Sequence, residues 1–185
     1  MPKSNSADTD PVNTGFPDGG SVDESTQADE PVITISTVRH TAVRLLSRRE
    51  HSRAELRDKL LTRKHPLNLI EQALDQLAER NLQCDVRFAE SYTRMRVQRG
   101  YGSNKIRAEL QTRSLSRDII ENALLVYEGE WIDNAISALR KKYSENDLAR
   151  SSVKELAKMQ RFLWSRGYNS AEISTAIKTL RQPVE

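Results

Sequence analysis

The chain has 185 residues, of which 30% are charged and 37% are hydrophobic, a length that favours one domain or one small array. Aromatic residues make up 5%, too few for the core of a β-sandwich or barrel, and no run of about 18 apolar residues could span a membrane. The first residues lack the apolar stretch of a signal peptide, and one cysteine, Cys84, cannot form an internal disulfide, so we expect a cytoplasmic protein.

Residues 1–36 differ from the rest of the chain. They hold one Lys and seven acidic residues, a net charge of −6, whereas residues 37–185 hold 28 basic and 19 acidic residues, a net charge of +9. Their apolar residues are too sparse to offset the entropy cost of ordering, which predicts a disordered acidic tail with a short extended end at residues 32–35. The tail either competes with nucleic acid for the basic body or serves solubility, and we favour solubility.

From residue 37 onward, apolar residues recur at helical spacing, and capping signals divide the body into helices. Ser52 with Glu55 and Asn169 with Glu172 suggest capping boxes, while Asp85, Ser103 and Ser116 are candidate N-caps. Gly100, Gly129 and Gly167 suit helix C-termini. Nine helices and no strand are predicted, over residues 37–50, 52–63, 66–80, 85–99, 103–113, 116–128, 130–143, 149–166 and 169–181.

The body also contains an internal repeat with a period near 50 residues. Six positions keep their character in three copies. They are Leu56, Leu60, Arg63, Ile70, Ala73 and Leu74 in the first copy, Ile106, Leu110, Arg113, Ile120, Ala123 and Leu124 in the second, and Met159, Leu163, Arg166, Ile173, Ala176 and Ile177 in the third. We predict an all-α protein of three tandem three-helix repeats, 37–84, 85–129 and 130–182, in an elongated, curved array whose neighbours bury one another's apolar faces.

The basic residues of the body are concentrated in the first two helices of each repeat. Segments 39–65, 92–117 and 140–166 carry net charges of +6, +6 and +5, whereas the third helices at 66–80 and 116–130 carry −2 and −3. If the repeats stack in register, the bases line one surface that suits phosphates. The candidate contacts are Arg94, Arg96, Arg99, Lys105, Arg107, Arg113, Arg140, Lys141, Lys142, Lys154, Lys158 and Arg161.

For each single basic residue a purely structural role remains open, because charged stripes on helices are usually solvated faces. Lys105, Glu109 and Arg113, for example, have the spacing of an intrahelical ion-pair row. Catalytic signals are lacking: the sequence has no Gly-rich phosphate loop, no zinc-ligand spacing and no nucleophile elbow. We therefore expect no enzyme, cofactor or metal. The aromatic residues Trp131, Trp164, Tyr101 and Tyr168 are expected to close helix cores more readily than to stack on bases.

Several stretches resemble the RecX family, the regulators of the bacterial RecA recombinase. The resemblance rests on Arg87-Phe88-Ala89-Glu90-Ser91-Tyr92, Arg99-Gly100-Tyr101-Gly102 and Ile106-Arg107-Ala108-Glu109-Leu110, with further stretches at 42–52 and 160–168. It covers residues 38–180 in order. Family members commonly have Gly where this chain has Lys64 and Ser114, and Gln83-Cys84-Asp85 replaces their usual Leu-Asp-Asp; these departures fall at turns and helix caps.

The resemblance implies a non-enzymatic modulator, mainly an inhibitor, that binds the groove of the RecA–DNA filament. Such proteins restrain strand exchange, ATP hydrolysis and coprotease activity, which would place this chain in recombination, DNA repair and the SOS response. The partners expected are the RecA filament and DNA, single- or double-stranded and without base specificity, for a monomer that binds no membrane. Two alternatives are a direct DNA-binding regulator of the helix-turn-helix kind and a scaffold that binds protein alone.

Overall fold

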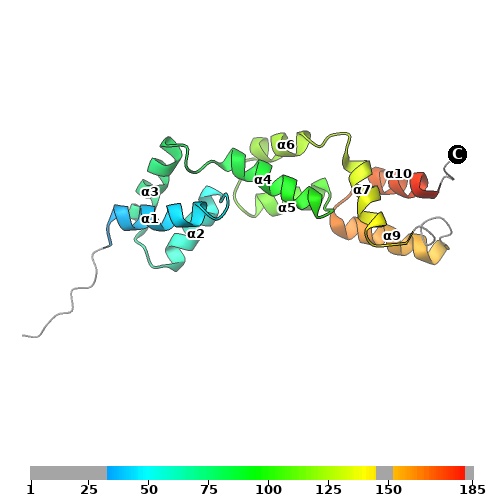
Figure 1. Ribbon diagram of the computed structural model, residues 1–185, viewed down its shortest axis with the longest axis horizontal. Coiled ribbons are helices and arrows are strands. Elements are labelled where there is room, and N and C mark those ends of the chain that lie inside the picture. The colour runs from blue at the N-terminus through cyan, green and yellow to red at the C-terminus, as the bar shows by residue number, and fades with distance from the viewer. Residues whose placement is uncertain (1–32, 145–151, 182–185) are drawn as a thin grey trace, which may run out of the picture. The chain divides into compact units, whose positions relative to one another are not determined.

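The computed structural model describes residues 33–144 and 152–181, and within these ranges the chain forms nine helices and no strand (Figure 1). The predicted helices are all present. They are α1 (Ile35–Leu46), α2 (Arg53–Thr62), α3 (Leu67–Glu79), α4 (Asp85–Gln98), α5 (Ser103–Gln111), α6 (Arg117–Leu125), α7 (Trp131–Arg140), α9 (Val153–Arg166) and α10 (Ser170–Arg181). We call α1–α3 module 1, α4–α6 module 2, and α7, α9 and α10 module 3.

Most of the predicted acidic tail, residues 1–32, lies outside the described residues. Of its predicted extended end at residues 32–35, the structure contradicts Ile35, where α1 begins. Thr34 is the N-cap in an extended conformation, and its hydroxyl accepts a hydrogen bond from the Thr37 N–H. A capping hydroxyl satisfies one of the free N–H groups of the first turn, which is why the helix can start two residues before the predicted boundary.

The predicted capping boxes have different outcomes. Asn169 and Glu172 bond reciprocally, with the Glu172 N–H 2.9 Å from Asn169 Oδ1 and the Asn169 N–H 2.8 Å from Glu172 Oε2. Ser52 accepts from the Glu55 N–H at 3.1 Å, but the Glu55 carboxylate turns to arginines of other segments. Ser152 and Glu155 form a complete capping box that the sequence analysis did not identify.

Two of the candidate N-caps are wrong and one is confirmed. Ser116 caps α6, whereas Asp85 and Ser103 are the first helical residues, and Cys84 and Gly102 occupy the N-cap positions. The Asp85 carboxylate is used elsewhere, because it accepts hydrogen bonds from the backbone N–H of Arg53 in α2 and from Gln83, both at 2.8 Å. Long-range contacts thus decide the roles of these residues.

Residues in the left-handed region end the second helix of every module. Lys64, Ser114 and Gly167 occupy the same repeat position and have φ values of 60°, 59° and 90°. Lys64 and Ser114 stand where the resemblance leads us to expect glycine, so the turn adopts its conformation without the residue that adopts it most readily. A non-glycine residue in this region carries a cost of about 1 kcal/mol.

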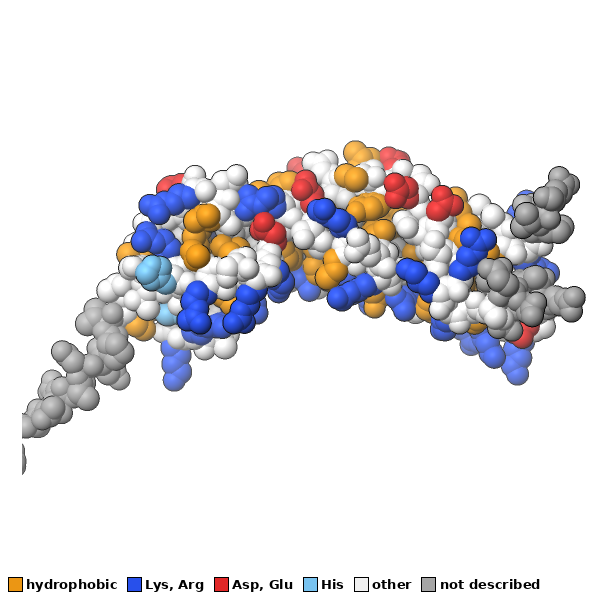
Figure 2. Space-filling model, in the orientation of Figure 1, with side chains coloured by type: hydrophobic (Ala, Val, Ile, Leu, Met, Phe, Trp, Pro, Cys, Tyr) orange, Lys and Arg blue, Asp and Glu red, His pale blue; other side chains and the backbone are white. Residues whose placement is uncertain are grey.

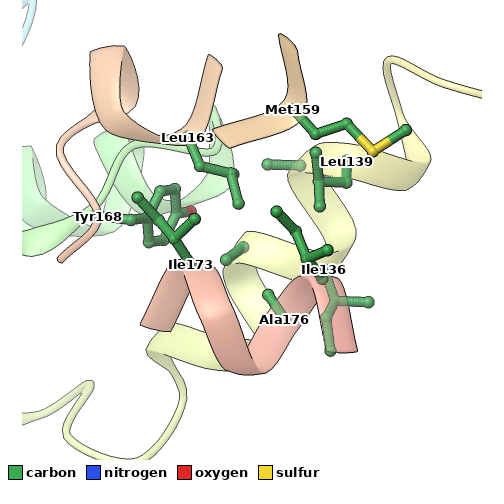
Figure 3. Packing of buried hydrophobic residues seen from close by; sticks show 10 residues of the cluster. Ile136, Leu139, Met159, Leu163, Tyr168, Ile173 and Ala176 are labelled. Atoms are coloured by element: carbon green, nitrogen blue, oxygen red, sulfur yellow. The ribbon is translucent and has the colours of Figure 1, made fainter. Parts of the chain in front are cut away.

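Each module has its own hydrophobic core. All fifteen apolar residues at the five repeated apolar positions are buried, and they fall into three separate clusters, one per module. Figure 3 shows the third cluster, in which Leu139 of α7, Met159 and Leu163 of α9 and Ile173 of α10 meet. The predicted burial of apolar faces between neighbours is therefore wrong in the main, although Trp131 packs against the cores of both modules 2 and 3.

Candidate nucleic-acid interface

The second helices of consecutive modules meet end to end. At the N-terminus of α5 the Gly102 N–H donates to the Arg166 carbonyl at 2.9 Å, and the Asn104 N–H donates to the Gly167 carbonyl at 3.1 Å. The free N–H groups of α5 thereby satisfy the free carbonyls at the end of α9. Glycine is required at this contact, because a Cβ on Gly102 would lie 2.6 Å from the Gly167 oxygen.

The junction between modules 1 and 2 repeats this arrangement with a side chain. The Ser52 hydroxyl at the N-terminus of α2 donates to the Arg113 carbonyl beyond the end of α5, at 3.3 Å. Helices α2, α5 and α9 therefore form one row, which Figure 1 draws along its lower side. Because these helices carry much of the basic charge, the row collects bases from all three modules.

In modules 2 and 3, the arginine at the end of the second helix contacts the preceding module. Arg113 Nε lies 3.0 Å from Glu55 Oε1 of module 1, and Arg166 Nη1 lies 2.8 Å from the Arg99 carbonyl of module 2. Arg87 adds a second ion pair to the first junction, 3.0 Å from Glu50. Arg63, at the same repeat position in module 1, reaches its own helix at the Lys59 carbonyl, 2.7 Å away.

Among the described residues, the candidate contacts Arg96, Arg107 and Arg113 form ion pairs with carboxylates of the fold. Arg107 binds Glu121 of α6 through two hydrogen bonds of 2.8 and 3.0 Å, which raise the pKa of Arg107 and lower that of Glu121. Arg96 pairs with Glu109 and lies over the Tyr101 ring at 3.7 Å, while Arg113 pairs with Glu55. Carboxylates already neutralise these guanidinium groups, so they suit a structural role better than phosphate binding.

The intrahelical ion-pair row considered from the sequence does not form among the described residues. The Glu109 carboxylate turns away from Lys105, and it accepts from the Tyr92 hydroxyl at 2.9 Å and from Arg96. Arg113 donates to the backbone carbonyl of Glu109 instead. Lys105 is exposed and its ammonium has no hydrogen bond or ion pair within the described part of the chain.

Three other candidates gather at a cavity of about 420 Å³ between modules 2 and 3. Arg99 of module 2 and Lys141 and Lys142 of module 3 line it together with Arg166, which the sequence analysis left out of the candidate contacts. No carboxylate is among its lining residues. Four like charges at one cavity repel each other, so the cavity favours an anion. We call it the junction pocket.

An aromatic ring forms part of the junction pocket. Lys142 Nζ lies 4.0 Å and Arg166 Cζ 5.0 Å from the centre of the Phe162 ring. Such cation–π contacts contribute about 0.5–1 kcal/mol each at exposed sites and help to position the two cations at the pocket. Within the described ranges the Arg99 guanidinium has no side-chain partner, so it remains able to bind phosphate.

The same junction carries acidic groups at a different cavity. Glu121, Glu128 and Glu172 line a space of about 420 Å³ next to Trp131. Figure 2 shows the acidic side chains gathered along the upper margin, over α6, while basic side chains lie along the lower margin. This separation of charge would direct a polyanion to one side of the junction.

The remaining candidates lie on exposed positions. Lys154, Lys158 and Arg161 follow one face of α9 at i, i+4 and i+7 spacing. Arg94 and Arg140 are also exposed. The expectation for Trp164 is wrong, because its side chain is 65% exposed, whereas Tyr168 is buried as expected.

Among the residues described, no group of three or more His, Cys, Asp and Glu side chains could hold a metal ion. In the same part of the chain, no helix is long and apolar enough to cross a membrane. The third helices of modules 1 and 2 present acids to the second helices, as in the pair of Arg57 Nε and Glu71 Oε1 at 2.7 Å. An acidic third helix argues against its use as a recognition helix in DNA.

Three family models match the chain in succession. They describe the first, second and third three-helix domains of RecX, and they match residues 39–77, 85–124 and 128–177. The regulatory protein RecX of Legionella pneumophila is 38% identical over 141 residues, which are 76% of this chain and 93% of that protein. This chain belongs to the RecX family. The RecX of Chromohalobacter salexigens is 40% identical over 142 residues, covering 77% of this chain and 91% of its own.

A solved RecX structure shares the fold. The crystal structure of RecX from Lactobacillus salivarius matches with a TM-score of 0.68 at 25% identity, and the match covers 79% of this chain and 96% of that one. The resemblance identified from the sequence is confirmed, as is the all-α class with three three-helix units. The matched RecX proteins are regulatory proteins by name.

Proposed function

We propose that this protein regulates the RecA recombinase, mainly as an inhibitor, by binding in the groove of the RecA–DNA filament. It restrains strand exchange, ATP hydrolysis and coprotease activity without catalysis or a cofactor of its own. Family membership supports the RecA partner. The observation that supports the mode of binding is the end-to-end row of α2, α5 and α9 with the carboxylate-free junction pocket beside it.

The serial arrangement suits a long, repetitive partner. Three modules joined through their second helices present basic groups at successive points, so one monomer contacts several positions of a filament at once. Contacts to phosphates carry no sequence information, which accounts for binding without base specificity. We assign the repeats to residues 37–84, 85–129 and 130–182, and the protein to the cytoplasm, where RecA filaments assemble.

Nine of the twelve candidate bases are the direct contacts in this proposal. They reach DNA phosphates or acidic groups of the filament, and they are Arg94, Arg99, Lys105, Arg140, Lys141, Lys142, Lys154, Lys158 and Arg161. Arg96, Arg107 and Arg113 act indirectly, because their guanidinium groups hold Glu109, Glu121 and Glu55 and thereby fix the helices that carry the contacts.

Cosedimentation with RecA filaments, compared with bare DNA and with RecA alone, tests the partner. The residue test replaces Arg99 and Lys142 with Ala and uses R80A/R117A as a control that removes the same charge from exposed positions near the ends of α3 and α6. We expect R99A/K142A to weaken inhibition of RecA ATP hydrolysis and to lower the salt slope of DNA binding by about 1.4–1.8 units. Equal effects of the two variants would show that net charge acts and the junction pocket does not.

A further inference from the structure

Two adjoining hollows run between α9 and α10 on module 3. The first, of about 320 Å³, is lined by Gln160, Arg161, Trp164, Ser170, Ile173 and Ser174. The second, of about 370 Å³, is lined by Leu156, Gln160, Ser174, Ile177, Lys178 and Arg181. Gln160 and Ser174 border both hollows, so the two form one continuous surface, which we call the α9–α10 groove.

An aromatic ring stands open at one end of this groove. The Trp164 side chain is 65% exposed, and it makes no ring contact with another aromatic residue in the described part of the chain. It therefore contributes little to the module 3 core, which Leu163 and Met159 of the same helix fill. An indole exposed to this degree offers an apolar face that a planar ligand can cover.

The groove is basic along its whole length. Arg161 lies beside Trp164, Lys178 and Arg181 line the other end, and no carboxylate is among the lining residues. The nearby acids are engaged: Glu172 accepts from the Asn169 N–H at 2.8 Å, and Glu155 accepts from the Ser152 N–H at 2.7 Å.

The basic row continues along α9 away from the groove. Lys154 and Lys158 precede Arg161 on the same face, and Trp164 follows it by three residues. The distance from Lys154 to Trp164 along the helix axis is about 15 Å. One helix thus presents several cations in line with a stacking platform, which is the combination that single-stranded nucleic acids bind.

We propose that the α9–α10 groove binds single-stranded nucleic acid, with one base stacked on Trp164 and its phosphates on Arg161, Lys178 and Arg181. Stacking needs an unpaired base, because the bases of a duplex are covered by their neighbours. The three charged lining residues, Arg161, Lys178 and Arg181, are all cationic, which favours a polyanion over a protein surface of mixed charge. The proposal goes beyond RecA regulation, because the groove needs no RecA to bind.

The two tryptophans of the chain allow a direct test. W131F leaves Trp164 as the single tryptophan, and W164F leaves Trp131, which is half-buried between two cores. We titrate both variants, without RecA, with an oligothymidylate of about 12 nucleotides and with the matching duplex. The single strand should quench the fluorescence of W131F and leave that of W164F unchanged, and the duplex should quench neither.

Affinity gives a second readout. By fluorescence anisotropy of a labelled strand, W164A should bind the oligothymidylate about 5- to 150-fold more weakly, the loss expected for one stacked base, and W164F should retain most of the affinity. Circular dichroism checks that the exposed position leaves the fold intact. Equal affinity of W164A and the parent, or equal quenching by strand and duplex, would refute stacking on Trp164.

Other outcomes separate this proposal from the proposed function. If the emission maximum of Trp164 in W131F shifts with protein concentration and does not respond to the strand, the groove serves self-association and the proposal is overturned. Quenching by the strand in a parent protein that does not inhibit RecA ATP hydrolysis would support the groove and refute the RecA assignment. Inhibition of RecA without any quenching would retain the RecA assignment and overturn the groove.

Discussion

Replacing Arg113 with Ala should loosen the junction between modules 1 and 2, and replacing Arg63 should not. The two arginines occupy the same repeat position at the end of a second helix. Arg113 pairs with Glu55 of the preceding module and lies 4.5 Å from the centre of the Tyr92 ring, whereas Arg63 contacts the Lys59 carbonyl of its own helix. The comparison removes the same side chain from the same local structure, with and without a neighbouring module.

The size of the effect follows from the contacts that are lost. A hydrogen bond between charged groups contributes about 1.5–3 kcal/mol when buried, and an exposed ion pair contributes about 0.2–1 kcal/mol. The Arg113 and Glu55 side chains are 27% and 17% exposed, which places the pair between these limits. Glu55 keeps Arg49 as a partner at 3.0 Å, so no carboxylate is left alone. We expect R113A to cost about 1–2 kcal/mol and R63A less than about 0.5 kcal/mol.

Urea denaturation followed by far-UV circular dichroism measures both values, and a double-mutant cycle of R113A with E55Q isolates the pair. The coupling energy should be about 1 kcal/mol for residues in direct contact. In thermal melts, each kcal/mol should lower the Tm by about 2–4 °C for a chain of this length. Equal losses for R113A and R63A, or a coupling energy near zero, would refute the assignment of Arg113 to the junction.

Three further predictions concern stability. Leu110 and Leu163 are fully buried at equivalent positions, so L110A and L163A should each cost about 2–5 kcal/mol in urea denaturation; losses below about 0.5 kcal/mol would place both side chains outside the cores. S114G should raise stability by about 1 kcal/mol in the same assay, because φ is 59° at this position, and a loss would mean that the hydroxyl outweighs the backbone cost. Burial, and then the charge of Arg49, lower the pKa of His51 below 6.5 in the folded chain. Below pH 6.5 the unfolded chain therefore binds a proton that the folded chain does not bind, and acid favours unfolding. Thermal melts should show the Tm falling as the pH drops below 6.5, and falling less in H51N.

The parts of the fold that depend on local pattern could be predicted from the sequence. Helical periodicity locates every described helix, and the repeat identifies the buried positions because each module builds the same small core. The left-handed turns at Gly100, Gly129 and Gly167 could be predicted as well, since glycine adopts this conformation readily. These features follow from residues within a few positions of one another.

The roles of polar side chains depend on neighbours that are distant in sequence. The sequence around Asp85 predicts an N-cap, but the Asp85 carboxylate accepts a hydrogen bond from the Arg53 N–H of another module. The basic segment around Arg107 predicts a phosphate contact, but Glu121 of the next helix neutralises the Arg107 guanidinium. Periodicity alone does not show which side of a helix lacks a neighbour, which is why the expectation of a buried Trp164 is wrong. The spacing of Ser170, Ser174, Lys178 and Arg181 on α10 is the signal that could have indicated an open, basic face there.

The construction of the junctions explains why so much basic charge remains available. Module 2 meets module 3 largely through backbone groups at Gly102 and Gly167, and it meets module 1 through a few arginine contacts, so the junctions use few of the cations. Because the three cores are separate, a change at a junction need not disturb the packing within a module. Trp131 is the exception, because it packs on the cores of both modules 2 and 3, so a change at this residue should affect two modules at once.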